Sequence, residues 1–406
     1  MKQRIQEAIA SYHDEITDFT RELVAIPTEN PPGRAYAECA AVLRRKLDEL
    51  GLPCEVHELP APANAVAQAT PGYCLTSSFG EGERAVYFHG HYDVVPASSE
   101  TQFQPRLQNG NLFGRGSADM KSGLAAMFYA VKALKGLEVK LSGRIGVVFV
   151  PDEETGGARG SQALAAMGLL GHDAIAMLTP EPTGGVIWNA NRGAISLRVT
   201  IKGKPAHVGL ECRGVNAFER MLDVAQQLRK LKAQVAQRET KFRISPDAAR
   251  KSILMLGGEF RGGGNFNVVP AKCSITVDRR TNPEENFETE KVALLDLFDQ
   301  ARNNGTDLDI EIFQEGRSSG TPETHPVAQA LAESVQDVTG KKPEFEMCPG
   351  LLETRFYAEN GTPAFAYGPG MLSVAHGPNE FVAMKDVFSC AAVYALVALR
   401  LLGKEK

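Results

Sequence analysis

The chain has 406 residues, of which 43% are hydrophobic, so it can bury a large core and exceeds the usual length of one domain. Its formal net charge of −5 argues against a nucleic-acid-binding surface, and no uncharged stretch approaches the roughly 18 apolar residues of a membrane span. Seven cysteines without Cys-x-x-Cys spacing, and an amphipathic start without the apolar core of a signal peptide, favour a cytoplasmic protein.

The first informative feature along the chain is a histidine and an aspartate that follow an apolar strand. The strand is Ala85–Phe88, and His91 and Asp93 follow it at spacing i, i+2. Residues at this spacing point to the same side of an extended chain, so the Asp93 carboxylate can reach one ring nitrogen of His91 while the other binds a metal. An ordinary polar loop is the alternative for this segment taken alone.

A glycine-rich loop, Gly114–Gly123, opens the next predicted helix, which runs from about Met120 to Leu134. Asp119 lies at the start of this helix, where aspartate is a favoured N-cap. The sequence therefore leaves two roles open for Asp119, a metal ligand or a plain helix cap.

A near-continuous apolar run, Gly143–Val150, is typical of a buried parallel strand. Asp152, Glu153 and Glu154 follow it directly. Three adjacent carboxylates repel one another and need a compensating cation, unless they lie in a solvated turn.

Two later strands also end in residues that bind metals. Asp173–Leu178 is followed by Glu181, and Pro363–Tyr367 by a glycine-rich loop that contains His376. In open parallel sheets, ligands bind beyond the carboxyl ends of the strands, so we expect one convergent site. Histidine and carboxylate ligands without cysteine suit zinc, with manganese or cobalt as alternatives. Two such ions about 3.5–4 Å apart need a bridging carboxylate.

The pattern changes after Gly185 to a self-contained α+β unit with the order βαββαβ. Its first helix has an apolar stripe, which consists of Phe218, Met221, Leu222, Val224, Ala225 and Leu228. We expect the first domain to resume near Thr321, with a helix over 326–339. The predicted strands of the inserted unit are 194–202, 252–256, 272–277 and 308–313, and its helices are 216–237 and 285–302.

Taken in order, the motifs resemble those of the superfamily of co-catalytic zinc hydrolases that includes acetylornithine deacetylase, succinyl-diaminopimelate desuccinylase, aminoacylase and carboxypeptidase G. The resemblance implies an α/β, zinc-exopeptidase-like catalytic domain with a mostly parallel sheet, formed by residues 1–185 and 316–406. It also implies that the α+β insertion, residues 186–315, serves as a lid and dimerisation domain. The matching segments are Leu23–Thr28, Gly90–Val95, Arg115–Lys121, Asp152–Glu154, Glu181–Thr183 and His376.

The same resemblance implies a role for each metal-site residue. Asp119 would bridge two divalent ions, with His91 and Glu181 on one ion and Glu154 and His376 on the other. These ions would most often be zinc.

Two neighbouring carboxylates would act without binding metal. Asp93 would orient His91, and Glu153 would be the general base that deprotonates the water between the ions and passes the proton to the leaving amine. The resemblance also implies a cis peptide bond between Asp119 and Met120.

Four residues would contact the substrate. His207 would reach the active site of the partner subunit in a homodimer and stabilise the oxyanion. Asn267 would contact substrate, and Arg280 and Arg355 would bind its carboxylate, because a planar guanidinium suits that task. A surface position for the histidine and surface ion pairs for the arginines are the alternatives.

The sequence departs from the family pattern near the expected substrate pocket. Val208–Gly209 replaces a serine pair, Glu211 replaces a proline, and Leu351 and Leu352 replace a hydroxyl-bearing and a small residue. An apolar pocket wall argues against succinyl-diaminopimelate as the substrate.

We therefore predict a metal-dependent hydrolase that cleaves N-acyl amino acids. The alternative is a metallo-carboxypeptidase or dipeptidase acting on short peptides. A catalytically silent binding protein of the same fold is disfavoured, because such a protein needs no general base and Glu153 is intact.

Overall fold

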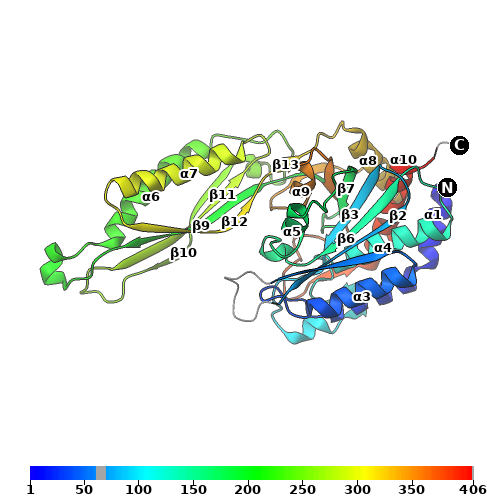
Figure 1. Cartoon of the computed structure of the whole chain (residues 1–406), viewed down its shortest axis with the longest axis horizontal. Coiled ribbons are helices and arrows are strands. Elements are labelled where there is room, and N and C mark those ends of the chain that lie inside the picture. Colours follow the sequence, from blue (N-terminus) through cyan, green and yellow to red (C-terminus); the bar gives the residue numbers. More distant parts are fainter. Residues whose placement is uncertain (61–69, 405–406) are drawn as a thin grey trace. The chain divides into compact units, whose positions relative to one another are not determined.

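The structure, a computed structural model, describes residues 1–60 and 70–404 and contains two compact units (Figure 1). The first unit comprises Met1–Asn189, Gly320–Glu346 and Glu353–Lys406. The second comprises Ala190–Ser319 together with the short segment Met347–Leu352. The sequence placed the insertion at residues 186–315 and did not include the short segment.

The first unit is built on a mostly parallel central sheet, as predicted. Its strand order is β1-β2-β6-β3-β7-β15-β8-β13, and β14 pairs with β8. The pairs β3/β6, β3/β7 and β15/β7 are parallel, whereas β1/β2 and β2/β6 are antiparallel. The bounds are β1 (Cys54–Leu59), β2 (Gly72–Gly80), β3 (Ala85–His91), β6 (Arg144–Val150), β7 (Ala174–Thr179), β8 (Ile187–Asn191), β13 (Ser319–Gly320), β14 (Phe345–Cys348) and β15 (Ala364–Ala366).

Helices cover both faces of this sheet, because its central strands are apolar on both sides. Val147 and Phe149 of β6 belong to the core formed with α4 and α10, whereas Val148 and Val150 pack in a separate core with α5 and α9. No helix of residues 1–60 and 70–404 has both the length and the apolar character needed to cross a bilayer. The helices are α1 (Lys2–Ser11), α2 (His13–Ala25), α3 (Tyr36–Glu49), α4 (Lys121–Gly136), α5 (Ser161–Ala166), α8 (Pro326–Thr339), α9 (Thr354–Ala358) and α10 (Met384–Leu402).

The parallel pairing brings four chain segments to one edge of the sheet. His91 at the end of β3 pairs with Val150 at the end of β6, immediately before the acidic turn. Ala366 at the end of β15 pairs with Thr179 at the end of β7. The loops that carry the predicted metal ligands therefore start side by side. A small three-stranded sheet has the order β16 (Phe381–Ala383), β5 (Asn111–Phe113) and β4 (Arg106–Gln108), so it joins the segment after the His376 loop to the segment before the Asp119 loop.

The second unit has the predicted βαββαβ order. Its antiparallel sheet has the order β10-β11-β9-β12, and the inward residues of β9 pack with α6 and α7. The strands run further than predicted, and β10 contains a bulge between Leu256 and Phe260. The elements are β9 (Gly193–Lys202), α6 (Ala217–Val235), β10 (Ile253–Gly262), β11 (Lys272–Thr281), α7 (Phe287–Asn303) and β12 (Leu308–Gly316).

One prediction for α6 was wrong. Met221, Val224 and Leu228 are buried, but Phe218 is 42% exposed and Leu222 is 53% exposed. The apolar stripe of this helix is wider than the face that the sheet covers, so part of it meets solvent within this unit.

Candidate metal centre

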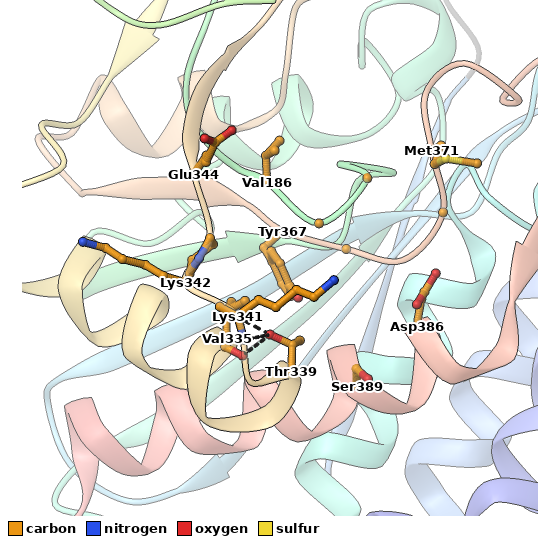
Figure 2. Close-up of a pocket in the computed structure, with 15 residues that line it drawn as sticks. Val186, Val335, Thr339, Lys341, Lys342, Glu344, Tyr367, Met371, Asp386 and Ser389 are labelled. Atoms are coloured by element: carbon orange, nitrogen blue, oxygen red, sulfur yellow. Dashed lines mark hydrogen bonds between the residues drawn. The ribbon is translucent and has the colours of Figure 1, made fainter.

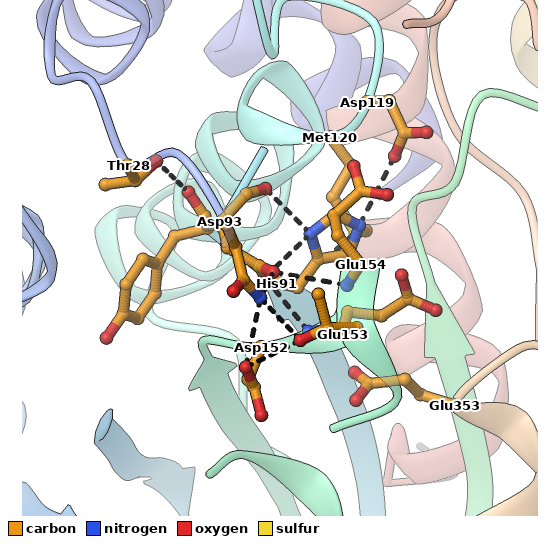
Figure 3. A network of polar contacts seen from close by, with 12 residues as sticks. Thr28, His91, Asp93, Asp119, Met120, Asp152, Glu153, Glu154 and Glu353 are labelled. Atoms are coloured by element: carbon orange, nitrogen blue, oxygen red, sulfur yellow. Dashed lines mark hydrogen bonds and ion pairs between the residues drawn. The ribbon is translucent and has the colours of Figure 1, made fainter. Parts of the chain in front are cut away.

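The five predicted metal ligands come together in two groups that share one residue. His91, Asp119 and Glu181 form one group, and Asp119, Glu154 and His376 form the other. In each group the ligand atoms lie within 4.8 Å of one another. Each group could hold a cation, and Figure 3 shows three of the five side chains, His91, Asp119 and Glu154.

Asp119 presents one carboxylate oxygen to each group. Its Oδ1 is 3.3 Å from His91 Nε2, and its Oδ2 is 3.1 Å from His376 Nε2. The alternative role as a helix cap was wrong, because the N-cap of α4 is Met120 and no side chain caps that helix. The expected cis peptide bond between Asp119 and Met120 is present.

The donor set fits divalent cations. Two imidazoles and three carboxylates without a thiol are ligands that zinc, manganese and cobalt accept. The Oε1 atom of Glu154 is buried and has no hydrogen bond of acceptable geometry, although His376 Nε2 lies 3.2 Å away. A buried carboxylate oxygen without a partner is costly, and a cation at this position would remove that cost.

The electrostatics of the cluster support the same fit. Burial, followed by the charge of Asp119, raises the pKa of Glu181 to about 8. The close carboxylates of Asp119 and then of Glu154 raise the pKa of His376 to about 10. The cluster without metal therefore holds protons at neutral pH, and metal binding would displace them.

Asp93 connects the histidine ligand to the acidic turn. Its Oδ1 lies 3.3 Å from His91 Nδ1, and its main-chain oxygen lies 3.1 Å from the same nitrogen (Figure 3). The backbone N–H groups of Glu153 and Glu154 each donate to an Asp93 carboxylate oxygen at 3.1 Å. Asp93 therefore fixes both the ring of His91 and the backbone that carries Glu153.

Glu153 belongs to neither ligand group, although it precedes the ligand Glu154 on the short helical turn Glu153–Thr155. Burial raises the pKa of its carboxyl group well above the usual value, and the charges of Glu181, Glu154 and Glu353 act in the same direction. A carboxylate with a raised pKa accepts a proton more readily than an ordinary glutamate.

Sequence reasoning missed a brace behind the acidic turn. Asn30 Nδ2 donates to Asp93 Oδ2 at 2.9 Å and to Asp152 Oδ1 at 3.0 Å. Arg159 Nη2 donates to Asp152 Oδ1 at 2.6 Å and to Asn30 Oδ1 at 3.2 Å. Asp152, the first of the three adjacent acids, is therefore paired with an arginine and belongs to neither ligand group. Asn30 lies far from this motif along the chain, so no local sequence pattern could predict the contact.

A second missed brace joins the loops of Asp119 and His376. Glu380 Oε1 accepts hydrogen bonds from the backbone N–H groups of Ala118 and Asp119 at 3.0 and 3.2 Å. Its Oε2 accepts from Arg115 Nη1 at 2.6 Å, and Arg115 Nη2 donates to the main-chain oxygen of His376 at 3.0 Å. Both side chains are buried. In the sequence, Arg115 lies four residues before Asp119 and Glu380 lies four residues after His376. This proximity to predicted ligands was the only indication of their role.

A third missed group lies on β3 itself. His89 is two residues before His91 and is fully buried. Its Nε2 lies 2.6 Å from Glu353 Oε2 and 2.8 Å from Ser161 Oγ, and its Nδ1 lies 3.0 Å from the Tyr357 hydroxyl. The pair His89–Glu353 thus places a further buried carboxylate near Glu153.

Of the predicted substrate residues, Arg355 lies in the first unit and is buried. Its guanidinium lies over the ring of Phe356 at 4.2 Å and donates to the main-chain oxygen of Gly156 at 3.3 Å. Gly156 directly follows the turn that carries Glu153, so Arg355 contacts that turn.

The other three substrate residues belong to the second unit. His207 is exposed, and its backbone bridges to Val268, while the N–H of Val208 donates to the main-chain oxygen of Asn267 at 2.9 Å. The structure therefore brings His207 and Asn267 side by side. Arg280 forms the ion pair considered as its alternative, with Asp278 Oδ1 2.9 Å from its Nε. Leu352 is buried and Leu351 is half-buried.

Comparison with known proteins agrees with this geometry. Residues 87–400 match the family model described as peptidase family M20/M25/M40. The chain is 26% identical over 403 residues to the succinyl-diaminopimelate desuccinylase of Xylella fastidiosa (strain 9a5c), with 96% of this chain and 99% of the relative covered.

Solved structures share the fold. The di-peptidase Dug1p from Saccharomyces cerevisiae has a TM-score of 0.77 at 16% identity, covering 98% of this chain and 99% of that chain. The M20 family metallo-carboxypeptidase Sso-CP2 from Sulfolobus solfataricus has a TM-score of 0.76 at 17% identity, covering 95% and 98%. At these identities the likeness concerns the fold alone.

Proposed function

Because the chain belongs to peptidase family M20/M25/M40 and is a metal-dependent hydrolase of amide bonds, we propose that it is a deacylase that releases amino acids from N-acyl amino acids. The observation that carries this proposal is Asp119 between His91 and His376, with Glu153 beside the ligand Glu154. The named desuccinylase relative favours a deacylase of amino-acid metabolism over a peptidase.

We assign two divalent ions to the two ligand groups that share Asp119, and the donor chemistry favours zinc. Bound ions would lower the pKa of water and polarise the scissile carbonyl. Cobalt or manganese would suit the same donors.

Glu153 is the proposed general base. It takes a proton from the attacking water and donates it to the leaving amine, and its raised pKa suits a group that carries a proton between these steps. Asp93 supports this role, because it accepts the backbone N–H of Glu153 and so limits where that side chain can lie. Arg355, which contacts the same turn through Gly156, is the proposed partner of the substrate carboxylate.

His207 and Asn267 are proposed to serve the active site of the partner in a homodimer, with Arg280 as a second carboxylate partner. The second unit has exposed apolar side chains close to His207 in the sequence, on α6 and in the segment that precedes β11. Exposed apolar side chains of this kind favour a protein partner. They include Val208, Leu210, Val215, Phe218, Leu222, Phe266 and Val268.

We propose a cytoplasmic location, which the seven cysteines favour because none of them forms a disulfide in the described part of the chain. The substrate is a small N-acyl amino acid or a short peptide. No feature of the charge distribution points to nucleic acid, and the site chemistry requires no membrane.

A substrate panel on metal-reconstituted enzyme tests the proposal. We expect N-acetyl or N-succinyl amino acids to be cleaved with kcat/KM at least about tenfold above that of dipeptides, a discrimination of roughly 1.4 kcal/mol in transition-state binding. Glu153→Gln provides the background rate. Faster cleavage of dipeptides, or of peptides from the carboxyl end, would instead identify a dipeptidase or a metallo-carboxypeptidase.

A further inference from the structure

A second cavity in the first unit has no role in the proposed reaction. It has a volume of about 440 Å³, within the roughly 300–1,000 Å³ of small-molecule sites (Figure 2). Its walls are the loop 184–186, the end of α8, the segment 341–344, the loop 367–371 and the first turns of α10. None of the five proposed metal ligands lines it.

Two opposite charges line this cavity without pairing. In Figure 2 the ammonium of Lys341 points toward the side where Asp386 lies, whereas that of Lys342 points away. Among residues 1–60 and 70–404, neither Lys341 nor Asp386 has an ion-pair partner within 4.0 Å. The side chains of Lys341 and Asp386 are both exposed to solvent, and partial burial raises the pKa of Asp386, which the neighbouring charge of Lys385 opposes. Both groups are therefore available to a ligand.

Apolar side chains complete the wall. Val186, Val335 and Met371 line the cavity, together with the largely buried ring of Tyr367. A complementary ligand carries a carboxylate, an ammonium group and an apolar side chain.

We propose that this cavity binds a free α-amino acid with an apolar side chain, with the ligand carboxylate on Lys341 and its ammonium group on Asp386. A simple anion would pair with Lys341 alone, and a simple cation would pair with Asp386 alone. An apolar molecule would desolvate both charges. A zwitterion satisfies both groups at once.

The cavity is placed to influence the metal centre. Gly368, in the cavity wall, packs tightly against the loop that follows β7. A Cβ added at Gly368 would lie 2.5 Å from the main-chain oxygen of Glu181. At Gly370, an added Cβ would lie 3.2 Å from Cα of Ala118, the neighbour of Asp119. The N–H of Gly184 also donates to the main-chain oxygen of Gly370 at 2.9 Å. The loop 368–371 therefore has the cavity on one side and the backbone of two ligand segments on the other.

A consequence follows for regulation, and it rests on the proposed function. Free amino acids are the product class of a deacylase, so product bound in this cavity would alter turnover without competing with substrate. Binding in itself does not depend on which amide bond the enzyme cleaves.

Calorimetric titration of the full-length, metal-loaded protein with L-leucine tests the binding site. N-acetyl-L-leucine lacks the ammonium group and L-leucinamide lacks the carboxylate, so both should bind at least about tenfold more weakly. Lys341→Met and Asp386→Asn should each weaken L-leucine binding by at least about tenfold. Lys342→Met and Glu344→Gln remove the same charges from neighbouring wall positions and should bind as the parent protein does.

Asp386 lies in the first turn of α10, where an acid also favours the helix, so the melting temperature of Asp386→Asn is measured alongside. Equal L-leucine binding by the parent protein, Lys341→Met and Asp386→Asn would overturn the proposal. So would equal affinity for L-leucine and the two blocked analogues.

The coupling is tested by hydrogen exchange at the Gly184 amide and by inhibition kinetics. We expect L-leucine to slow that exchange by about fivefold or more and to lower kcat without raising KM, and both effects should be lost in Asp386→Asn. Unchanged exchange with L-leucine bound would overturn the coupling. If the protein has no deacylase activity, the titration and the exchange still decide the binding proposal, so the two failures are distinguishable.

Discussion

Replacing Glu380 by glutamine tests the brace that joins the loops of Asp119 and His376. The Glu380 carboxylate accepts two backbone N–H groups with one oxygen and Arg115 with the other, and it is 2% exposed. A glutamine keeps the shape, but its amide N–H₂ must face either Arg115 or the backbone N–H groups. One set of donors then loses its acceptor in either orientation, and Arg115 keeps a buried charge without a counterion.

Breaking a buried ion pair by removing one partner costs roughly 3–5 kcal/mol. We therefore expect Glu380→Gln to lower the free energy of unfolding of the metal-free first unit by about that amount. Because the lost acceptor also holds the backbone of Asp119, zinc affinity should fall, by about 10- to 100-fold for an outer-shell partner. Urea unfolding followed by circular dichroism, together with zinc titration, measures both effects.

Glu333→Gln is the matched control, since Glu333 is paired with Arg400 at 3.4 Å and its side chain is 65% exposed. An exposed pair contributes about 0–1 kcal/mol, so the control should stay close to the parent protein. If Glu380→Gln unfolds like Glu333→Gln and binds zinc like the parent, the brace does not position the metal ligands and the reasoning is refuted.

Three further outcomes are expected. Metal analysis of loaded protein should approach two ions per chain. Asp119→Asn should lose most of this metal, because Asp119 presents one oxygen to each ligand group. Full activity with one ion, or normal metal content in Asp119→Asn, would contradict the shared site. Glu153→Gln should keep its metal and lose about 10²- to 10⁴-fold in kcat, because only the proton transfer is removed; retained activity would move that role to another group. His207→Ala should lower kcat by roughly 10²- to 10³-fold at unchanged metal content. Mixing His207→Ala with Glu153→Gln, with subunit exchange checked by mass spectrometry, should restore part of the activity, and a mixture that exchanges but stays inactive would rule out a histidine supplied by the partner.

The sequence by itself determined four strands of the central sheet and the reactive side chains that follow them, whereas β1, β2, β8, β13 and β14 of the same sheet were not predicted. The apolar run before Asp152, and those before Glu181 and His376, are local features that the residue order records. The alternation of β9 and the βαββαβ order of the second unit are equally local, and both were confirmed. Periodicity also predicted α6, although it could not show that Phe218 and Leu222 lie beyond the face that the sheet covers.

Only the tertiary structure decided which of these side chains meet. The parallel register of His91 with Val150 and of Ala366 with Thr179 brings the loops together, and no local pattern contains a register between distant strands. The same arrangement places the Asp119 carboxylate beside the two histidines, whereas the sequence alone also allowed a helix cap. It also pairs Glu380 with Arg115, which lies 265 positions away in the chain. Chain order specifies the type of each residue, whereas a buried hydrogen bond depends on the packing of every element between its partners.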